Sequence, residues 1–179
     1  MEVLYKSTRG DGSCVTASQA ILQGLSKDGG LFVPTSIPAL DLDLEQAAEM
    51  EYKDLAFHVM SRFFSDFTDE ELKNCIDNAY DSKFDTEEIA PVVKKNGTYY
   101  IELFHGATIA FKDMALSILP HLLTTAARKN NITNDIVILP LHPEIPARPL
   151  LRDSQMFPGQ RSSYFILMAV LAISKGSRW

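Results

Sequence analysis

The side chain with the clearest chemical potential is Lys112, which lies in the stretch ELFHGATIAFKDM at residues 102–114. Phe104 and Phe111 flank it, and an apolar surrounding favours the neutral amine, the form that acts as a Schiff-base nucleophile or proton carrier. A lysine near aromatic residues is, however, more often a surface residue whose methylene stem covers apolar area. The residue types alone therefore leave both interpretations of Lys112 open.

Four other polar or aromatic residues have ordinary structural explanations. Asp113 suits the first turn of a helix, where a carboxylate meets the positive end of the helix dipole, and Phe111 suits core packing. His105 can face the lysine, but a histidine at a strand end is more often hydrogen-bonded in a structural role. Arg9 can contact an anion, although a solvated arginine is the better expectation. We assign a catalytic role to none of them.

Metal and disulfide chemistry are not expected. His58, His121 and His142 show no ligand spacing with carboxylates or thiols, so we assign no metal site. Cys14 and Cys75 are the only cysteines, which is too few for a disulfide framework. Free thiols indicate a reducing compartment, and we expect the protein in the cytoplasm.

The overall composition favours a small-molecule partner. A net charge of −6 provides no basic field for nucleic acid or an anionic membrane. The longest apolar run, residues 164–173, is about half of the roughly 20 residues that span a bilayer. No secretory signal follows Met1. We therefore expect a soluble protein, with neither nucleic acid nor a membrane as partner.

Hydrophobic periodicity and turn signals predict the elements before the lysine stretch. These are helices over residues 17–25, 44–64 and 69–80, and a short strand over residues 31–33. Thr68 and Glu71 form a capping box, in which each side chain accepts a backbone amide of the other residue. Asn96 and Gly97 are the strongest short signal for a hairpin, formed by strands 92–95 and 98–103.

Lys112 is thus expected at a junction between a strand and a helix. The helical pattern covers residues 114–127, and Pro120 must kink or divide it because proline removes a backbone hydrogen bond. A buried strand over residues 135–139 follows and indicates the start of a parallel α/β layer.

The character of the sequence changes at Pro140. Prolines fall at positions 140, 143, 146, 149 and 158, in a stretch without helical or strand periodicity. The apolar run after Gln160 shows no amphipathic face. We expect residues 140–179 to be disordered or loosely packed, with an exposed apolar run that favours aggregation.

The lysine stretch closely resembles the cofactor-lysine motif of threonine synthases, whose pattern is near ELFHGPTLAFKD. The similarity includes STRG at residues 7–10 and GLSKDGGLFVP at residues 24–34, in the family's order, so that it covers the first 139 residues. Ala107 and Ile109 depart from the usual proline and leucine. Neither departure changes Lys112.

The resemblance implies a threonine synthase that depends on pyridoxal 5'-phosphate, with Lys112 as both the cofactor-binding and the catalytic residue. The implied substrate is O-phospho-L-homoserine, which the enzyme converts with water to L-threonine and phosphate by γ-elimination and β-addition. After the substrate amine displaces it, the Lys112 amine would act as general base and acid. Two alternatives remain: a related lyase acting on another phosphorylated amino alcohol, and a non-catalytic fragment or binding module.

The same resemblance implies an α/β fold class with three segments. Residues 1–95 are expected to form an α+β N-terminal domain, and residues 96–139 the start of a fold type II cofactor domain. Residues 140–179 are expected to be a non-native tail.

A shifted reading frame explains that tail. A threonine synthase is expected to continue after residue 139 with an SGDTG-type loop, but this chain continues as PLHPEIPARP. When the third base of each codon is joined to the first two bases of the next, the genetic code permits ASGDTGK over residues 142–148. No stop codon is forced before Trp179. We therefore expect a frameshift near Pro140, and we expect the chain as written to be inactive because it lacks the phosphate-binding loop.

Overall fold

A computed structural model describes residues 2–10, 12–140, 160–162 and 166–173 of the chain. The N-terminal part is a small antiparallel sheet of order β2-β1-β3, made of β1 (Tyr5–Ser7), β2 (Cys14–Val15) and β3 (Phe32–Pro34). Helix α1 (Ala17–Gln23) lies between β2 and β3 in the chain. It begins at a capping box of Thr16 and Gln19, which satisfies backbone amides at the helix start.

The expected long helix over residues 44–64 is wrong, because two helices occupy this region. They are α2 (Leu44–Ala48) and α3 (Tyr52–Phe63). Glu51 separates them: its ψ of 152° is extended, so it starts a new helix instead of continuing the first. The next helix, α4 (Asp69–Ala79), agrees with the prediction and begins at the capping box of Thr68 and Glu71.

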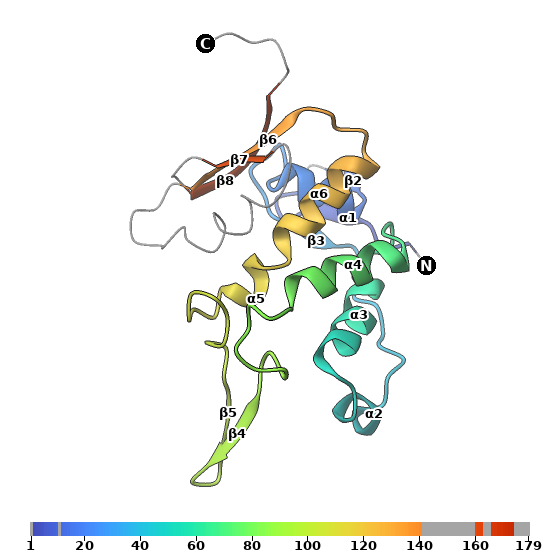
Figure 1. Cartoon of the computed structure of the whole chain (residues 1–179). Coiled ribbons are helices and arrows are strands. Elements are labelled where there is room, and N and C mark those ends of the chain that lie inside the picture. The colour runs from blue at the N-terminus through green and yellow to red at the C-terminus, as the bar shows by residue number, and fades with distance from the viewer. Residues whose placement is uncertain (1, 11, 141–159, 163–165, 174–179) are drawn as a thin grey trace.

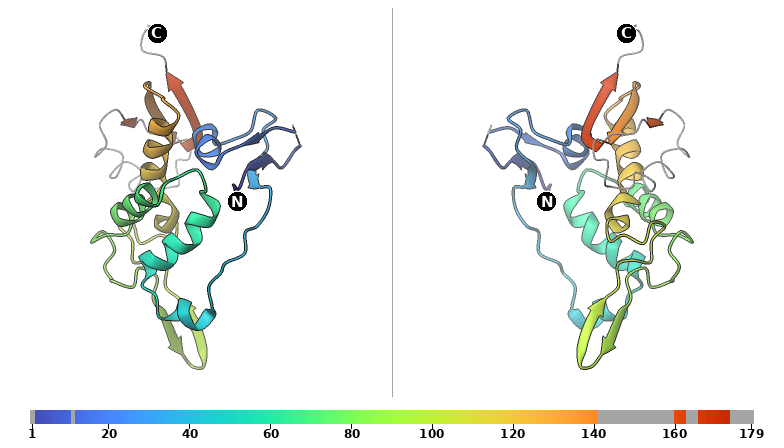
Figure 2. Two further views of the ribbon diagram at one scale, coloured as in Figure 1. Left: turned by 90° about the vertical axis from the view of Figure 1, so that its right-hand side faces the viewer. Right: turned by 90° about the vertical axis from the view of Figure 1, so that its left-hand side faces the viewer.

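The β-hairpin is confirmed as β4 (Val92–Lys95) and β5 (Thr98–Ile101). Asn96 and Gly97 occupy its turn with φ of 51° and 80°, as a two-residue turn with left-handed backbone requires. In Figures 1 and 2 the hairpin projects away from the helices. The lysine stretch therefore leads from this projection back to the helical part of the molecule.

Pro120 divides the helical pattern after the lysine stretch, as predicted. The two pieces are α5 (Asp113–Leu116) and α6 (Leu119–Lys129). Pro120 lies in the first turn of α6, where a missing amide costs no helical hydrogen bond.

The core lies where α6 packs against α1 and α4. Fully buried residues of α4, such as Leu72 and Ile76, belong to one cluster with Leu122 and Ala126 of α6. At the end of α6, the Lys129 ammonium donates to Glu71 at 2.9 Å. Asn130 then donates to the Ser18 hydroxyl at 2.9 Å, which ties α6 to α1. Segments that are far apart in the sequence thus share one core.

The last sheet is mixed. Strand β6 (Asp135–Pro140) confirms the predicted strand, and it pairs in parallel with β7 (Gln160–Ser162) and antiparallel with β8 (Ile166–Ile173). The expectation of a disordered tail is therefore wrong for β7 and β8. The reason is that an edge strand such as β6 presents unpaired backbone groups that further strands can satisfy. Residues 141–159, 163–165 and 174–179 lie outside the described residues.

The element order gives an α+β chain, which agrees with the expected class for its N-terminal part. Within the residues described, no helix has both the length and the apolar character needed to cross a membrane.

Candidate functional site

Lys112 lies at the head of helix α5, after the loop that follows β5. Its side chain is exposed. No ion pair involves Lys112 among the described residues, so its amine is uncommitted there. The strand-to-helix junction is therefore confirmed in outline, with an eleven-residue loop (residues 102–112) between the two elements.

The expected aromatic shielding of Lys112 is wrong for this chain. Phe111 is 65% exposed and does not pack in the core, and Phe104 is 48% exposed. Phe104 stacks on the His105 ring instead, with 4.7 Å between the ring centroids. Two adjacent aromatic residues cannot both turn toward a lysine seven positions away when one of them covers a neighbouring ring.

The shape of the lysine loop is set by Asp113. Its side chain is only 1% exposed, and its carboxylate accepts the Thr108 amide at 2.7 Å and the Thr108 hydroxyl at 2.5 Å. Asp113 is a first-turn helix carboxylate, as expected, but the bonds to Thr108 were not foreseen. They close residues 108–113 into a compact loop and direct the carboxylate away from solvent.

Gly106 is the second constraint on this loop. A Cβ atom at position 106 would lie 2.5 Å from the Cβ of Asp113 and 2.6 Å from its carboxylate, so only glycine fits there. The Ile109 amide donates to the Gly106 carbonyl at 3.0 Å, and Ile109 has a φ of 61°. A β-branched residue with left-handed backbone is strained, and such strain is maintained only where the surroundings impose it.

His105 joins the lysine loop to the segment before the hairpin. Its Nδ1 lies 2.5 Å from a carboxylate oxygen of Asp85, and its Nε2 lies 3.0 Å from one of Glu102. The hydrogen bond with Glu102, followed by that with Asp85, raises the pKa of the His105 ring. The Asp85 amide also donates to the His105 carbonyl at 3.0 Å. The structural role predicted for His105 is thus confirmed.

Arg9 serves the N-terminal loops and lies apart from the lysine stretch in its contacts. Its guanidinium donates to the Asp28 carbonyl at 3.0 Å. The Asp28 carboxylate accepts the Ser7 hydroxyl at 2.7 Å and the Gly30 amide at 2.9 Å, and these bonds lower the pKa of Asp28. The STRG and SKDGG segments that carry the family resemblance therefore contact each other directly.

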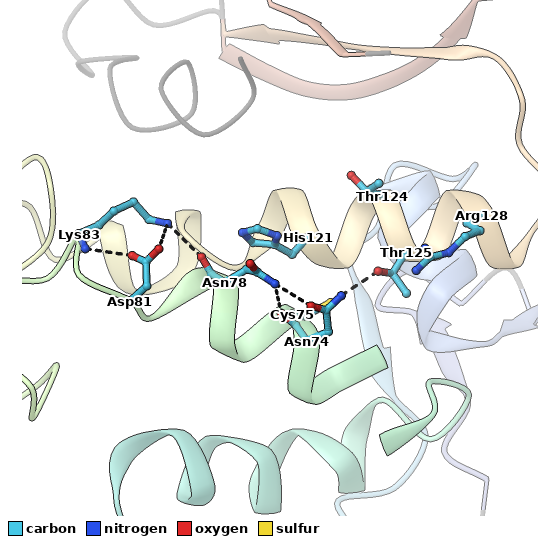
Figure 3. Close-up of a pocket in the computed structure, with 9 residues that line it drawn as sticks. All are labelled: Asn74, Cys75, Asn78, Asp81, Lys83, His121, Thr124, Thr125 and Arg128. Carbon is cyan, nitrogen blue, oxygen red and sulfur yellow. Dashed lines mark hydrogen bonds and ion pairs between the residues drawn. The ribbon is translucent and has the colours of Figure 1, made fainter. Parts of the chain in front are cut away.

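A polar groove of about 330 Å³ lies between α4 and α6, away from Lys112 (Figure 3). Nine residues line it: Asn74, Cys75, Asn78, Asp81, Lys83, His121, Thr124, Thr125 and Arg128. Burial, followed by the nearby Lys83 charge, lowers the pKa of His121. Lys83 itself pairs with Asp81 at 3.1 Å and donates to the Asn78 carbonyl. The groove is thus largely satisfied by its own contacts.

The histidines and cysteines show no arrangement for metal binding in the described part of the chain, and His142 lies outside that part. Cys14 is exposed and Cys75 is buried, and both are free thiols.

Comparison with known proteins places the chain among the threonine synthases. The family model "Threonine synthase N terminus" matches residues 4–80. The threonine synthase of Schizosaccharomyces pombe is 40% identical over 134 residues, which are 73% of this chain and 26% of the relative. The threonine synthase of Methylobacillus glycogenes is 36% identical over 73% of this chain and 30% of the relative.

A solved structure extends the likeness to the fold. The crystal structure of the yeast threonine synthase superposes with a TM-score of 0.78 and 28% identity, over 90% of this chain and 35% of that one. The chain thus spans between a quarter and two fifths of the length of these relatives. It belongs to the threonine synthase family and corresponds to the N-terminal part of those proteins.

Proposed function

We propose that this chain carries the N-terminal part of a threonine synthase, with Lys112 as its cofactor and catalytic residue. The observation that supports this most is the presentation of Lys112. Its amine is exposed and uncommitted at the head of α5, while the neighbouring Asp113 carboxylate is bonded to Thr108. A lysine paired with the adjacent carboxylate would be a poorer nucleophile.

The proposed cofactor is pyridoxal 5'-phosphate, and Lys112 fits as its point of covalent attachment because its amine is accessible. When bound, this cofactor supplies an electron sink for charge that develops at the substrate α carbon. The Nζ amine of Lys112 would first hold the cofactor and then move protons at the α and β carbons of O-phospho-L-homoserine. Loss of phosphate from the γ carbon and addition of water at the β carbon would give L-threonine and phosphate.

The rest of the proposed site belongs to the longer family members. An exposed lysine needs a dry, oriented pocket before it can act, and in this chain water reaches Lys112. We therefore expect the chain as written to be inactive. The proposed division at residues 95 and 139 and a frameshift near Pro140 explain why the family-like sequence stops where it does.

The nucleotide sequence across codons 138–142 tests the frameshift. A single insertion or deletion that restores SGDTG would support it, and its absence there would exclude it. The protein read in the restored frame should then release phosphate from O-phospho-L-homoserine and form threonine. Lys112→Ala should abolish both the activity and the visible absorbance of bound cofactor. Phosphate release only from another phosphorylated amino alcohol would overturn the substrate assignment.

A further inference from the structure

An exposed apolar surface extends from the β4–β5 hairpin to the lysine loop. Six large hydrophobic residues on these two segments are between 48% and 76% exposed: Val92, Tyr99, Ile101, Phe104, Ile109 and Phe111. We call them, together with Lys112, the hairpin–lysine surface. The hairpin that carries half of them projects from the helices in two perpendicular views (Figures 1 and 2).

Strand register places the hairpin residues on one face. Val92 pairs with Ile101 and Lys94 pairs with Tyr99, so alternation brings Val92, Tyr99 and Ile101 to the same side of the two strands. The only ring contact of this face is the Lys94 ammonium, 4.9 Å from the Tyr99 ring centroid among the described residues. A two-stranded hairpin is marginal in water by itself, and a cluster of exposed large hydrophobic residues marks an interaction site.

The lysine loop presents its part of the surface in a fixed shape. The two hydrogen bonds from Thr108 to Asp113 and the contact with Gly106 hold the loop while Ile109 and Phe111 face solvent. The Glu102 amide donates to the Pro91 carbonyl at 2.9 Å and continues the hairpin pairing toward the loop. A preformed surface loses little conformational entropy on binding, which favours docking of a rigid partner.

The family relationship indicates which partner this is. The chain corresponds to 26% of the fission yeast relative, so most of the polypeptide that completes that relative has no counterpart here. Lys112, in the middle of the surface, requires the exclusion of water for the proposed function, and a covering polypeptide would provide it. We propose that the hairpin–lysine surface docks a separate polypeptide that comprises the C-terminal part of a threonine synthase.

This inference rests on the proposed function but is tested by binding alone. The full 179-residue chain is mixed, without cofactor, with the part of the S. pombe relative that follows the matched region, and complex formation is measured by sedimentation and titration calorimetry. A one-to-one complex is expected. The double variant Tyr99→Ser/Ile101→Ser should weaken it at least about 30-fold, as expected for removal of central apolar anchors.

The matched control is Ile37→Ser/Leu44→Ser, which also removes two exposed aliphatic residues but outside the hairpin and the lysine loop. It should leave the affinity within about twofold, the usual result for residues outside a contact. Phe111→Ser provides a second variant on the proposed surface, should the double variant disturb the hairpin, and it should also weaken binding.

Three results would overturn the proposal: no complex at tens of micromolar, equal binding by the surface variants, or a homodimer of this chain that buries the hairpin and excludes the added polypeptide. The two proposals fail separately. A complex without threonine formation by the restored-frame protein would overturn the function only. An active restored-frame protein without a complex between the separate pieces would overturn the docking only.

Discussion

The carboxylate of Asp113 is hydrogen-bonded to both the backbone amide and the hydroxyl of Thr108, at 2.7 and 2.5 Å. Lys112 and Asp113 are adjacent in the sequence, yet Lys112 is exposed while Asp113 is fully buried. The carboxylate thus acts as a positioning group for the loop, and its charge is taken up by Thr108 instead of the lysine. This separation leaves the lysine amine available.

The Thr108–Asp113 pair should contribute measurably to stability. Thr108→Val keeps the shape of the side chain but leaves the buried carboxylate with one fewer donor. We expect a loss of about 1–3 kcal/mol in the free energy of unfolding, the usual cost of an unsatisfied buried group. Urea unfolding followed by circular dichroism measures it. Thr98→Val in the exposed strand β5 is the control and should change stability by less than about 0.5 kcal/mol.

Gly106 should not tolerate a methyl group. Gly106→Ala would place its Cβ 2.5 Å from that of Asp113, so the loop must move. We expect a destabilisation of about 1–3 kcal/mol from overpacking, together with faster proteolysis of the loop. Limited proteolysis with identification of the cleavage site checks this. Cleavage of wild type and variant at equal rates within residues 106–113 would show that the contact is unimportant.

His105 should make stability depend on pH. Its pKa is raised in the folded state by Glu102 and then Asp85, whereas an unfolded histidine titrates near about 6.5. The stabilising contribution is therefore complete below about pH 6.5 and is lost as the pH rises through the folded pKa. The Tm difference between wild type and His105→Gln should shrink between about pH 6 and pH 8.5.

The comparison with His105→Gln is needed because His121 titrates in the opposite sense. Its pKa is lowered by burial, so it reduces stability when the pH falls below about 6.5. NMR titration of the two rings should show His105 above and His121 below the ordinary value. A His105 ring that titrates at or below about 6.5 would contradict the assignment of its carboxylate contacts.

The two thiols should react at very different rates. Cys14 is exposed, whereas burial raises the pKa of Cys75, whose Sγ lies 3.6 Å from the Thr125 hydroxyl. Because the thiolate is the reactive form, a disulfide reagent should modify one thiol quickly and the second only on unfolding. Cys14→Ser should remove the fast phase, and Cys75→Ser should leave it unchanged. Two fast thiols in the wild type would show that the α4–α6 core opens readily.

Local signals in the sequence predicted the elements that depend on neighbouring residues. The capping box at Thr68, the Asn96-Gly97 turn and the division of a helix at Pro120 all appear where expected. Each is determined within one turn of chain, so a single sequence contains the necessary information.

Features that depend on contacts across space were missed. The strands β1 and β2 have only three and two residues, too short for a periodic signal, and their pairing defines them. The Thr108–Asp113 bonds depend on the fold of the intervening loop, and Ile109 adopts a backbone angle that its residue type disfavours. The family motif located Lys112, but its exposure follows from how Phe104 and Phe111 are oriented.

The bond between Asn130 and Ser18 joins residues 112 positions apart, and it has a consequence for synthesis on the ribosome. Helix α1 emerges first, but its packing partner α6 ends only at Lys129. At about 5–20 residues per second, α1 must wait roughly 6 to 22 s before its core can close. During that interval the nascent chain is held together only by local pairings such as the β1–β3 sheet, and it is then that it most needs protection by chaperones.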